Sequence, residues 1–194
     1  MLAQAFGCRI TCVERAQEFA DAARERTAAA GLQHLIDVVH ADAREFPLVP
    51  ERYDAALCLG ACFVWAGLEG TVAHLAPAVR PGGFVVVGEP YWRTWPLPDG
   101  FDREAGEDFA TLGETAERFE ATGLELTDAI VSSEDDWDRY ETLHWSTLDD
   151  WLRDHPDDPD AASFNDMGRK SKRRYLRWQR DLLGWVILVG RLPS

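Results

Sequence analysis

The stretch Arg9-Ile10-Thr11-Cys12-Val13-Glu14 decides the fold class of this chain. Its β-branched residues favour a strand, and that strand ends in a single carboxylate, Glu14. The segment from Arg15 to Ala30 repeats apolar residues at helical spacing, and Gly31 ends it. A strand that ends in an acid and leads into a helix is half of a nucleotide-binding unit, in which the acid accepts hydrogen bonds from ribose hydroxyls. The stretch therefore predicts an α/β fold with Glu14 as a ligand-binding residue.

Outward from this stretch, helices and strands alternate along the chain. Met1 to Phe6 is predicted to be the tail of a helix that Gly7 ends. Alternation of this kind predicts a Rossmann-like, mostly parallel sheet with helices on both faces. Further strands are predicted at Leu35–His40, at Tyr53–Gly60 (fully buried), at Phe84–Val87 running on to Trp92, at Leu124–Val131 and at Trp185–Val189. Further helices are predicted over 68–79 (shortened by Pro77), over 112–119 and from Met167 to Leu182.

The region before the last strand is organised differently. A helical insertion over about 133–183 joins the last two strands, and this order alone does not fix their relative direction. Within the insertion, Ser146 is predicted to cap a helix, with Asp149 in the capping-box position. The chain is predicted to be one domain over 1–194, with a cofactor-side half over 1–92 and a substrate-side half over 93–194.

Composition excludes several classes of function. A chain of 194 residues with 46% hydrophobic and 11% aromatic residues is typical of a folded domain. The net charge of −14 argues against a general binder of nucleic acid or anionic membrane, because neutralising phosphates needs a surplus of Lys and Arg. No run approaches the ~18 apolar residues of a membrane helix, and no secretory signal is visible. We therefore expect a cytoplasmic protein.

Four cysteines, in the pairs Cys8/Cys12 and Cys58/Cys62, invite a zinc interpretation. Residues four apart on a strand lie ~13 Å apart, which is too far to share one tetrahedral ion. Reduced thiols packed as small hydrophobic side chains are the favoured interpretation, and no metal site is expected.

Four features, in order along the chain, resemble class I S-adenosylmethionine-dependent methyltransferases. None of the four is specific alone, but the ordered set is fairly specific, and the 28 residues between Glu14 and Asp42 suit that family. The resemblance covers nearly the whole chain and is firmest up to Trp92. The features are Val13-Glu14 ending a strand, Ala41-Asp42-Ala43 ending the next, Tyr53-Asp54-Ala55-Ala56-Leu57 opening a buried strand, and Arg80-Pro81-Gly82-Gly83 before another.

The resemblance implies a seven-stranded sheet whose last strand is antiparallel and inserted between the fifth and sixth. It also implies S-adenosylmethionine as the cofactor, with Glu14 on the ribose hydroxyls and Asp42 accepting from the adenine amino group. The remaining cofactor-binding residues that it implies are Arg15 beside Glu14, Ala43 through its amide, and Leu59 and Gly60 near the methionine moiety and methyl group.

One departure from the family pattern is clear. Family members begin with a strand and a Gly-x-Gly-type loop, but none of the 15 glycines here forms a Gly-x-Gly. Aligned on Glu14, that segment would precede Met1. We therefore expect a chain that lacks the first strand of the family fold, from a truncated reading frame or a misassigned start codon.

Three residues are candidates for catalysis. Glu89 follows a strand at the end where catalytic groups gather in open sheets, and it is equally well explained as a structural partner for a neighbouring amide. Tyr91, with Trp92 and Trp95, either lines a substrate pocket or caps the edge of the core. His144 lies in the insertion, where an imidazole near neutral pKa suits deprotonation of a nucleophile, although such a histidine is more often a surface residue.

The predicted function is methyl transfer by in-line displacement to a small, partly apolar acceptor. Rival hypotheses are a truncated and inactive methyltransferase fold, a regulatory or scaffolding partner of an active enzyme, and a nicotinamide-dependent oxidoreductase, which shares Glu14 but does not explain Ala41-Asp42-Ala43. The basic face over 169–180 either binds an anionic substrate or, as favoured, pairs with the acidic segment 134–160.

Overall fold

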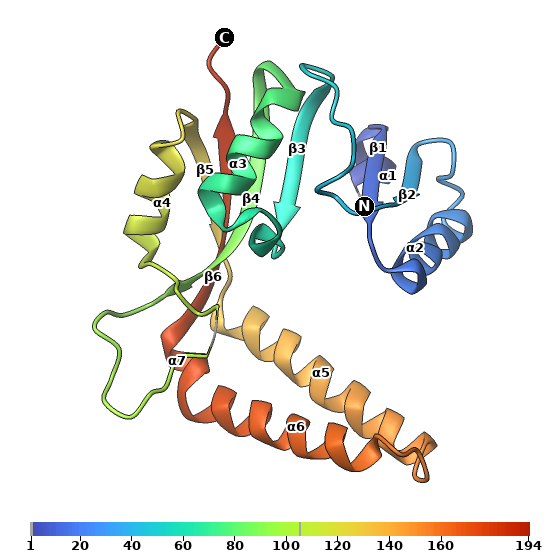
Figure 1. The fold of residues 1–194 in the computed structure, drawn as a ribbon, viewed down its shortest axis with the longest axis vertical. Helices are drawn as coiled ribbons and strands as arrows, with labels where there is room; N and C mark the ends of the chain where they lie inside the picture. The colour runs from blue at the N-terminus through green and yellow to red at the C-terminus, as the bar shows by residue number, and fades with distance from the viewer. Residues whose placement is uncertain (1, 105) are drawn as a thin grey trace. The chain divides into compact units, whose positions relative to one another are not determined.

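The structure, a computed structural model, describes residues 2–104 and 106–194 (Figure 1). The chain divides into two compact units, one ending at Val49 and one beginning at Pro50, and each is described by itself. The prediction of one domain over 1–194 stays a prediction. In the part of the chain that the structure describes, no helix has the length and apolar character needed to cross a membrane.

The first unit is a two-stranded parallel sheet with its helices. It contains α1 (Leu2–Phe6), β1 (Ile10–Glu14), α2 (Gln17–Ala29) and β2 (Ile36–His40), as the sequence predicted. Strand β1 pairs with β2 so that Glu14 lies opposite His40. Gly31 ends α2 with a φ of 68°, a left-handed conformation that glycine adopts without strain. Both strands therefore end side by side, which places the residues that follow them at one edge.

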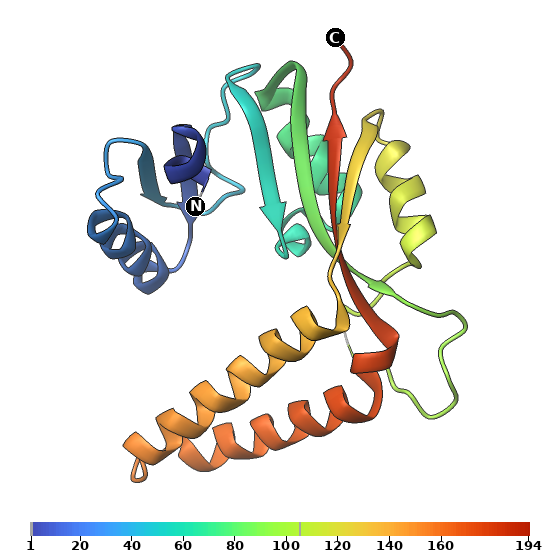
Figure 2. The same ribbon diagram turned by 180° about the vertical axis from the view of Figure 1, so that it is seen from behind.

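The second unit contains a four-stranded sheet in the order β3-β4-β6-β5 (Figure 2). Its strands are β3 (Tyr53–Leu59), β4 (Val79–Trp92), β5 (Glu125–Val131) and β6 (Leu183–Arg191). Strand β3 runs parallel to β4, whereas β6 is antiparallel to both β4 and β5. The last strand is thus antiparallel and lies between its two predecessors, which confirms the predicted fold class.

One face of this sheet is covered by α3 (Leu68–Leu75) and α4 (Leu112–Glu120). Pro77 lies in the 3-10 turn Ala76–Ala78, which ends α3 as predicted. The covered face holds the core, and the opposite face keeps large apolar side chains half exposed, including Leu57 and Leu59. The prediction that Tyr53–Gly60 is fully buried is therefore wrong, because β3 is an edge strand with one open face. Fully buried core residues include Val85, Val87, Phe119, Val186 and Leu188.

Between β5 and β6 the chain forms a helical hairpin (Figure 1). It consists of α5 (Glu134–Asp154) and α6 (Ala161–Arg174), followed by a π-helical turn (Tyr175–Gln179) and the short α7 (Arg180–Leu182). The predicted cap at Ser146 is wrong. Ser133 begins α5 with a full capping box to Asp136, and Ser146 lies inside the helix with its hydroxyl donating to the Leu143 carbonyl.

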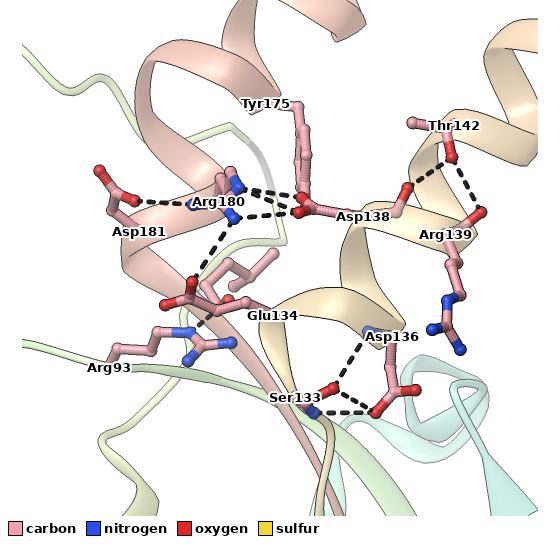
Figure 3. A network of polar contacts seen from close by, with 11 residues as sticks. Arg93, Ser133, Glu134, Asp136, Asp138, Arg139, Thr142, Tyr175, Arg180 and Asp181 are labelled. Atoms are coloured by element: carbon pink, nitrogen blue, oxygen red, sulfur yellow. Dashed lines mark hydrogen bonds and ion pairs between the residues drawn. The ribbon is translucent and has the colours of Figure 1, made fainter.

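A polar network joins the first turns of α5 to the segment that follows α6 (Figure 3). Arg180 donates three hydrogen bonds to Asp138, at 2.9, 3.0 and 3.2 Å, and the Tyr175 hydroxyl donates to the same carboxylate at 2.7 Å. The Arg180 guanidinium, and then the Tyr175 hydroxyl, hold the pKa of Asp138 below its usual value. These bonds hold the two ends of the insertion together beside the sheet.

The basic face pairs with acids less than predicted. In the described residues, Arg180 is the member of that face that forms ion pairs with the segment 134–160, through Glu134 and Asp138. Arg174 instead pairs with Glu104 and Glu107, which belong to the loop after β4. Most of the face is therefore solvated rather than paired with the acidic segment.

Candidate functional site

The carboxyl end of β1 presents Glu14 in a defined orientation. The backbone N–H of Ala16, at the start of α2, donates to Glu14 Oε1 at 2.7 Å. This bond leaves Oε2 without a donor among the described residues, on a half-buried side chain. Arg15 is held through its carbonyl, which lies 2.9 Å from His40 Nε2 at the end of β2. One carboxylate oxygen of Glu14 is thus fixed, and the other is free to accept from a ligand hydroxyl.

Asp42 lies just past the end of β2 and is already engaged. The Arg44 guanidinium donates to both of its oxygens, at 3.0 and 2.5 Å, and the Arg44 N–H adds a third bond at 2.9 Å. These bonds lower the pKa of the Asp42 carboxyl far below its usual range. The neighbouring Ala43 N–H has no acceptor among the described residues. An adenine amino group at Asp42 must therefore share the carboxylate with Arg44.

In the second unit, the chain turns sharply where β3 stops. Gly60 follows Leu59 with a φ of 77°, and its N–H donates to the Gly88 carbonyl of β4 at 3.1 Å. The Trp185 ring of β6 covers both glycines, since a Cβ would lie 3.1 Å from it at Gly60 and 2.6 Å at Gly88. The absence of side chains at these two positions lets the edge of a tryptophan ring approach the backbone at the end of β3.

Glu89 lies on the other face of β4, within a small group of thiols. The Cys62 thiol donates to the Gly88 carbonyl at 4.0 Å, and its side chain also influences the pKa of Glu89 and of Cys58. Burial raises the pKa of Glu89, against the weaker lowering effects of Cys62 and Arg118. Hydrogen bonding to Cys58 and burial also raise the pKa of Cys62, which keeps it a thiol. Glu89 is therefore a carboxylate whose basicity is increased.

The cysteine geometry differs from the expectation of two residues four apart on a strand. Strand β3 ends at Leu59, and Cys62 begins the 3-10 helix Cys62–Trp65, so the chain folds back and brings its thiol to Cys58. No group of three His, Cys, Asp or Glu side chains suitable for a metal occurs in the described residues.

Tyr91 and Trp92 are packed in the core at the end of β4. The Tyr91 ring lies against Gly184, where an added Cβ would be 2.2 Å from Cζ. Trp92 is 1% exposed and packs on Phe101 and Phe109 from the following loop. Trp95 is exposed, beyond this cluster.

His144 is placed on α5, where it belongs to an aromatic group. Its ring lies 4.6 Å from that of Tyr140, which contacts Trp137 at 5.6 Å, and Trp137 contacts Trp185 at 6.5 Å. Burial raises the pKa of the neighbouring Glu141, opposed by the charge of His144. In the described residues, no hydrogen bond joins His144 to Glu89, so the structure places the two candidate bases in separate groups.

The sequence did not indicate that Trp137 and Trp185 belong to the same aromatic group as His144. Three aromatic residues at spacings of three and four, Trp137, Tyr140 and His144, were a visible sign of one helix face. Their contact with Trp185 across the hairpin had no local signal.

Comparison with known proteins identifies the chain's relatives. The family model described as a methyltransferase domain matches residues 1–83. The uncharacterized protein YjhP of Escherichia coli is 30% identical over 183 residues, which is 92% of this chain and 73% of that protein.

Solved structures of methyltransferases also match this chain. A methyltransferase of Geobacter sulfurreducens, crystallised with S-adenosyl-L-homocysteine, is 30% identical, with a TM-score of 0.89 over 99% of this chain and 78% of that one. A second, from Thiobacillus denitrificans and with the same ligand, is 30% identical, with a TM-score of 0.86 over 97% and 77%. This chain belongs to the S-adenosylmethionine-dependent methyltransferases, and S-adenosylmethionine is its cofactor.

Proposed function

We propose that this methyltransferase transfers the methyl group to a small, partly apolar acceptor, and that Glu89 takes the acceptor's proton. The observation that carries the proposal is the half-buried Glu89 carboxyl at the end of β4, whose pKa burial raises. A base of raised pKa is better matched to proton removal near neutral pH than an ordinary carboxylate. The net charge of −14 favours a small molecule over a nucleic acid as the acceptor.

Six residues are proposed to hold the cofactor, four in the first unit and two in the second. When bound, S-adenosylmethionine supplies an activated methyl group on a positively charged sulfur. Glu14 has one free carboxylate oxygen for a ribose hydroxyl, and the Ala43 N–H is free to donate to the adenine ring. Asp42 accepts the adenine amino group beside Arg44. Arg15 lies next to Glu14, and Leu59 and Gly60 provide the turn for the methionine end.

The protein's part in the reaction is positioning and proton removal. The acceptor atom attacks in line, and the acceptor's proton passes to Glu89, or to His144 if the acceptor lies against α5. Tyr91 is proposed to act by fixing the end of β4 below Glu89, because its ring is wedged against Gly184. Its role thus depends on position and not on contact with the acceptor.

Incubation of the full chain with methyl-labelled S-adenosylmethionine and cell extract, fractionated into small molecules, nucleic acid and protein, tests the proposal. We expect label in the small-molecule fraction and at least ten-fold slower turnover for Glu89→Gln, with Glu117→Gln on the exposed face of α4 as the control. Label on nucleic acid alone overturns the acceptor class. Full activity of Glu89→Gln together with loss in His144→Asn assigns the proton to His144 instead.

A further inference from the structure

Trp185, Trp137, Tyr140 and His144 form a continuous aromatic row from the end of the sheet along α5. The contacts join them in that order, at ring-centroid distances of 6.5, 5.6 and 4.6 Å, each edge to face. We call these four residues the aromatic wall. All belong to the second unit, so their arrangement is fixed within one body.

The wall begins where β3 stops. Leu59, Gly88 and Ile187 are aligned across the sheet, and Trp185 lies two residues before Ile187 in β6, opposite Pro90. Alternate residues of a strand share a face, so Trp185 lies on the face of Gly88, and its ring covers Gly88 and Gly60. One end of the wall is therefore at Gly60, the residue proposed to lie near the transferred methyl group.

The wall differs from the other aromatic pairs of α5. Trp151 packs on Phe164 of α6, and Trp145 packs on Tyr175 of the π-helical turn that follows α6, so both close the contact between the two arms of the hairpin. Tyr140, by contrast, is 54% exposed, and the rings of Trp137 and Trp185 are only partly buried. A helix that needed only to pack on its neighbour has no use for this second aromatic row.

Two further features indicate a ligand surface. The indole N–H of Trp137 has no acceptor among the described residues, as is also true of Trp145, so a polar group that reached it would satisfy a buried donor. Cations stack on Trp145, Phe101, Trp178 and Phe84, whereas no described Lys or Arg covers a ring of the wall. Tyr140 and His144, which are both exposed, thus keep ring surface that no described cation covers.

We propose that the aromatic wall is the binding surface for the methyl acceptor and selects a planar aromatic ring that carries a hydroxyl group. Open ring faces attract the positive edge of another aromatic ring, which favours planar over saturated molecules. The reacting atom must offer a lone pair, so a neutral hydroxyl is suited and a protonated amine is not. This inference rests on the proposed function and names its acceptor class.

The reaction at such an acceptor balances without a further reagent. The ring oxygen forms a bond to the methyl carbon as the sulfur–methyl bond breaks, with that bond's electron pair staying on sulfur. The hydroxyl proton passes to the His144 imidazole, the base that the proposed function assigns to an acceptor lying against α5, because Glu89 lies on the opposite face of β4 from Trp185. Trp137 and Trp185 take no part in these steps and determine which acceptor is held.

The test compares 2-naphthol with its saturated analogue, decahydro-2-naphthol, on the full chain with S-adenosylhomocysteine present. We expect calorimetry to show at least five-fold tighter binding of 2-naphthol. Trp137→Leu and Tyr140→Leu should each weaken 2-naphthol binding about ten-fold and leave the saturated analogue unchanged. Trp151→Leu, the same type of change further along α5, is the control and should bind both probes as the wild type does.

Several results would overturn the inference. They are no binding of 2-naphthol, equal binding of the two alcohols, an equal loss in the Trp151→Leu control, and tighter binding of tetramethylammonium than of 2-naphthol. Failure of the proposed function has a different signature. In that case 2-naphthol binds to the wall and the variants lose it, but no methyl group is transferred to it or to any small molecule.

Discussion

The ends of β1 and β2 and the end of the four-stranded sheet present opposite chemistries. Past β1 and β2 lie carboxylates held by nearby backbone N–H groups and Arg44, over a few residues of sequence. Past β3 lie two glycines, a thiol group and an aromatic row, assembled from β3, β4, β6 and α5. The first surface suits a polar ligand that is the same for every member of the family. The second suits an apolar ligand that differs from one member to another. This division matches the roles proposed for the two surfaces, one towards the cofactor and one towards the acceptor.

The largest effect is expected where the aromatic region is packed most tightly. Gly184→Ala places a Cβ 2.2 Å from Tyr91 Cζ, so we expect the free energy of unfolding to fall by about 3 kcal/mol. Denaturant titration measures it. Gly113→Ala is the matched control, because no atom lies within 4 Å and alanine suits a helix better, by about 0.5–1 kcal/mol. Equal stability of the two variants would mean that Tyr91 is not fixed.

At the polar surface, Glu14→Gln should weaken binding of S-adenosylhomocysteine by about ten-fold, since a hydrogen bond to a charged group is worth roughly 1.5–3 kcal/mol. Calorimetry measures the affinity, and Glu18→Gln, exposed on α2, is the control. Trp137→Leu should leave this affinity unchanged. If Trp137→Leu weakened cofactor binding as much as Glu14→Gln, the division between the two surfaces would be disproved.

A pH dependence is expected from the hairpin that carries the wall. The pKa of Asp138 is lowered in the folded state by Arg180 and Tyr175, so its contribution to stability is present above the unfolded-state pKa and is lost as pH falls through the folded-state pKa. Asp138→Asn should therefore lower stability at pH 7, and the difference from the wild type should shrink as pH falls below the unfolded-state pKa of about 4, by thermal unfolding at each pH. Asp166→Asn on α6 should show no such difference, and a pH-independent loss in Asp138→Asn would point to packing instead.

The smallest expected effect on stability is that of replacing Glu89. Its pKa is raised by burial, so its ionisation opposes folding: the cost is absent below the unfolded-state pKa and grows as pH rises through the folded-state pKa. Glu89→Gln should be slightly more stable than the wild type at pH 7, equal at pH 4, and less active. A less stable variant at pH 7 would show that the carboxylate is a structural partner, the alternative that its sequence position also allowed.

The order of the strands along the chain, and the position of Glu14 and Asp42 at strand ends, followed from the sequence because their signals are local. Glu14 ends a β-branched run, and Asp42 follows a second one, so the sequence pattern by itself puts both at strand ends. Arg44 stands two residues after Asp42 in the sequence, but its hydrogen bonds to the Asp42 carboxylate depend on the geometry of the turn between them. The cap at Ser133 also has a local signal, Asp136 three residues on, and Ser146 with Asp149 shows the same spacing without forming a cap.

The aromatic wall could not be predicted from the sequence, and the reason is physical. Trp137 and Trp185 meet only because the hairpin returns the chain to the sheet and β6 enters between β4 and β5. The same applies to β3, whose apolar run is typical of a strand buried on both faces, although its exposure depends on which strands and helices reach it. Contacts set by topology leave no pattern within one element.

The position of β6 has a consequence for how the protein is made. During synthesis, β4 and β5 leave the ribosome long before residues 183–191, and each needs β6 as its partner. Until then both strands expose an unpaired edge, which is prone to association with other chains. The hairpin α5–α6 forms from neighbouring residues and is available early, whereas closure of the sheet is a long-range event and therefore slow. We expect nascent chains to remain dependent on chaperones until the last strand is complete.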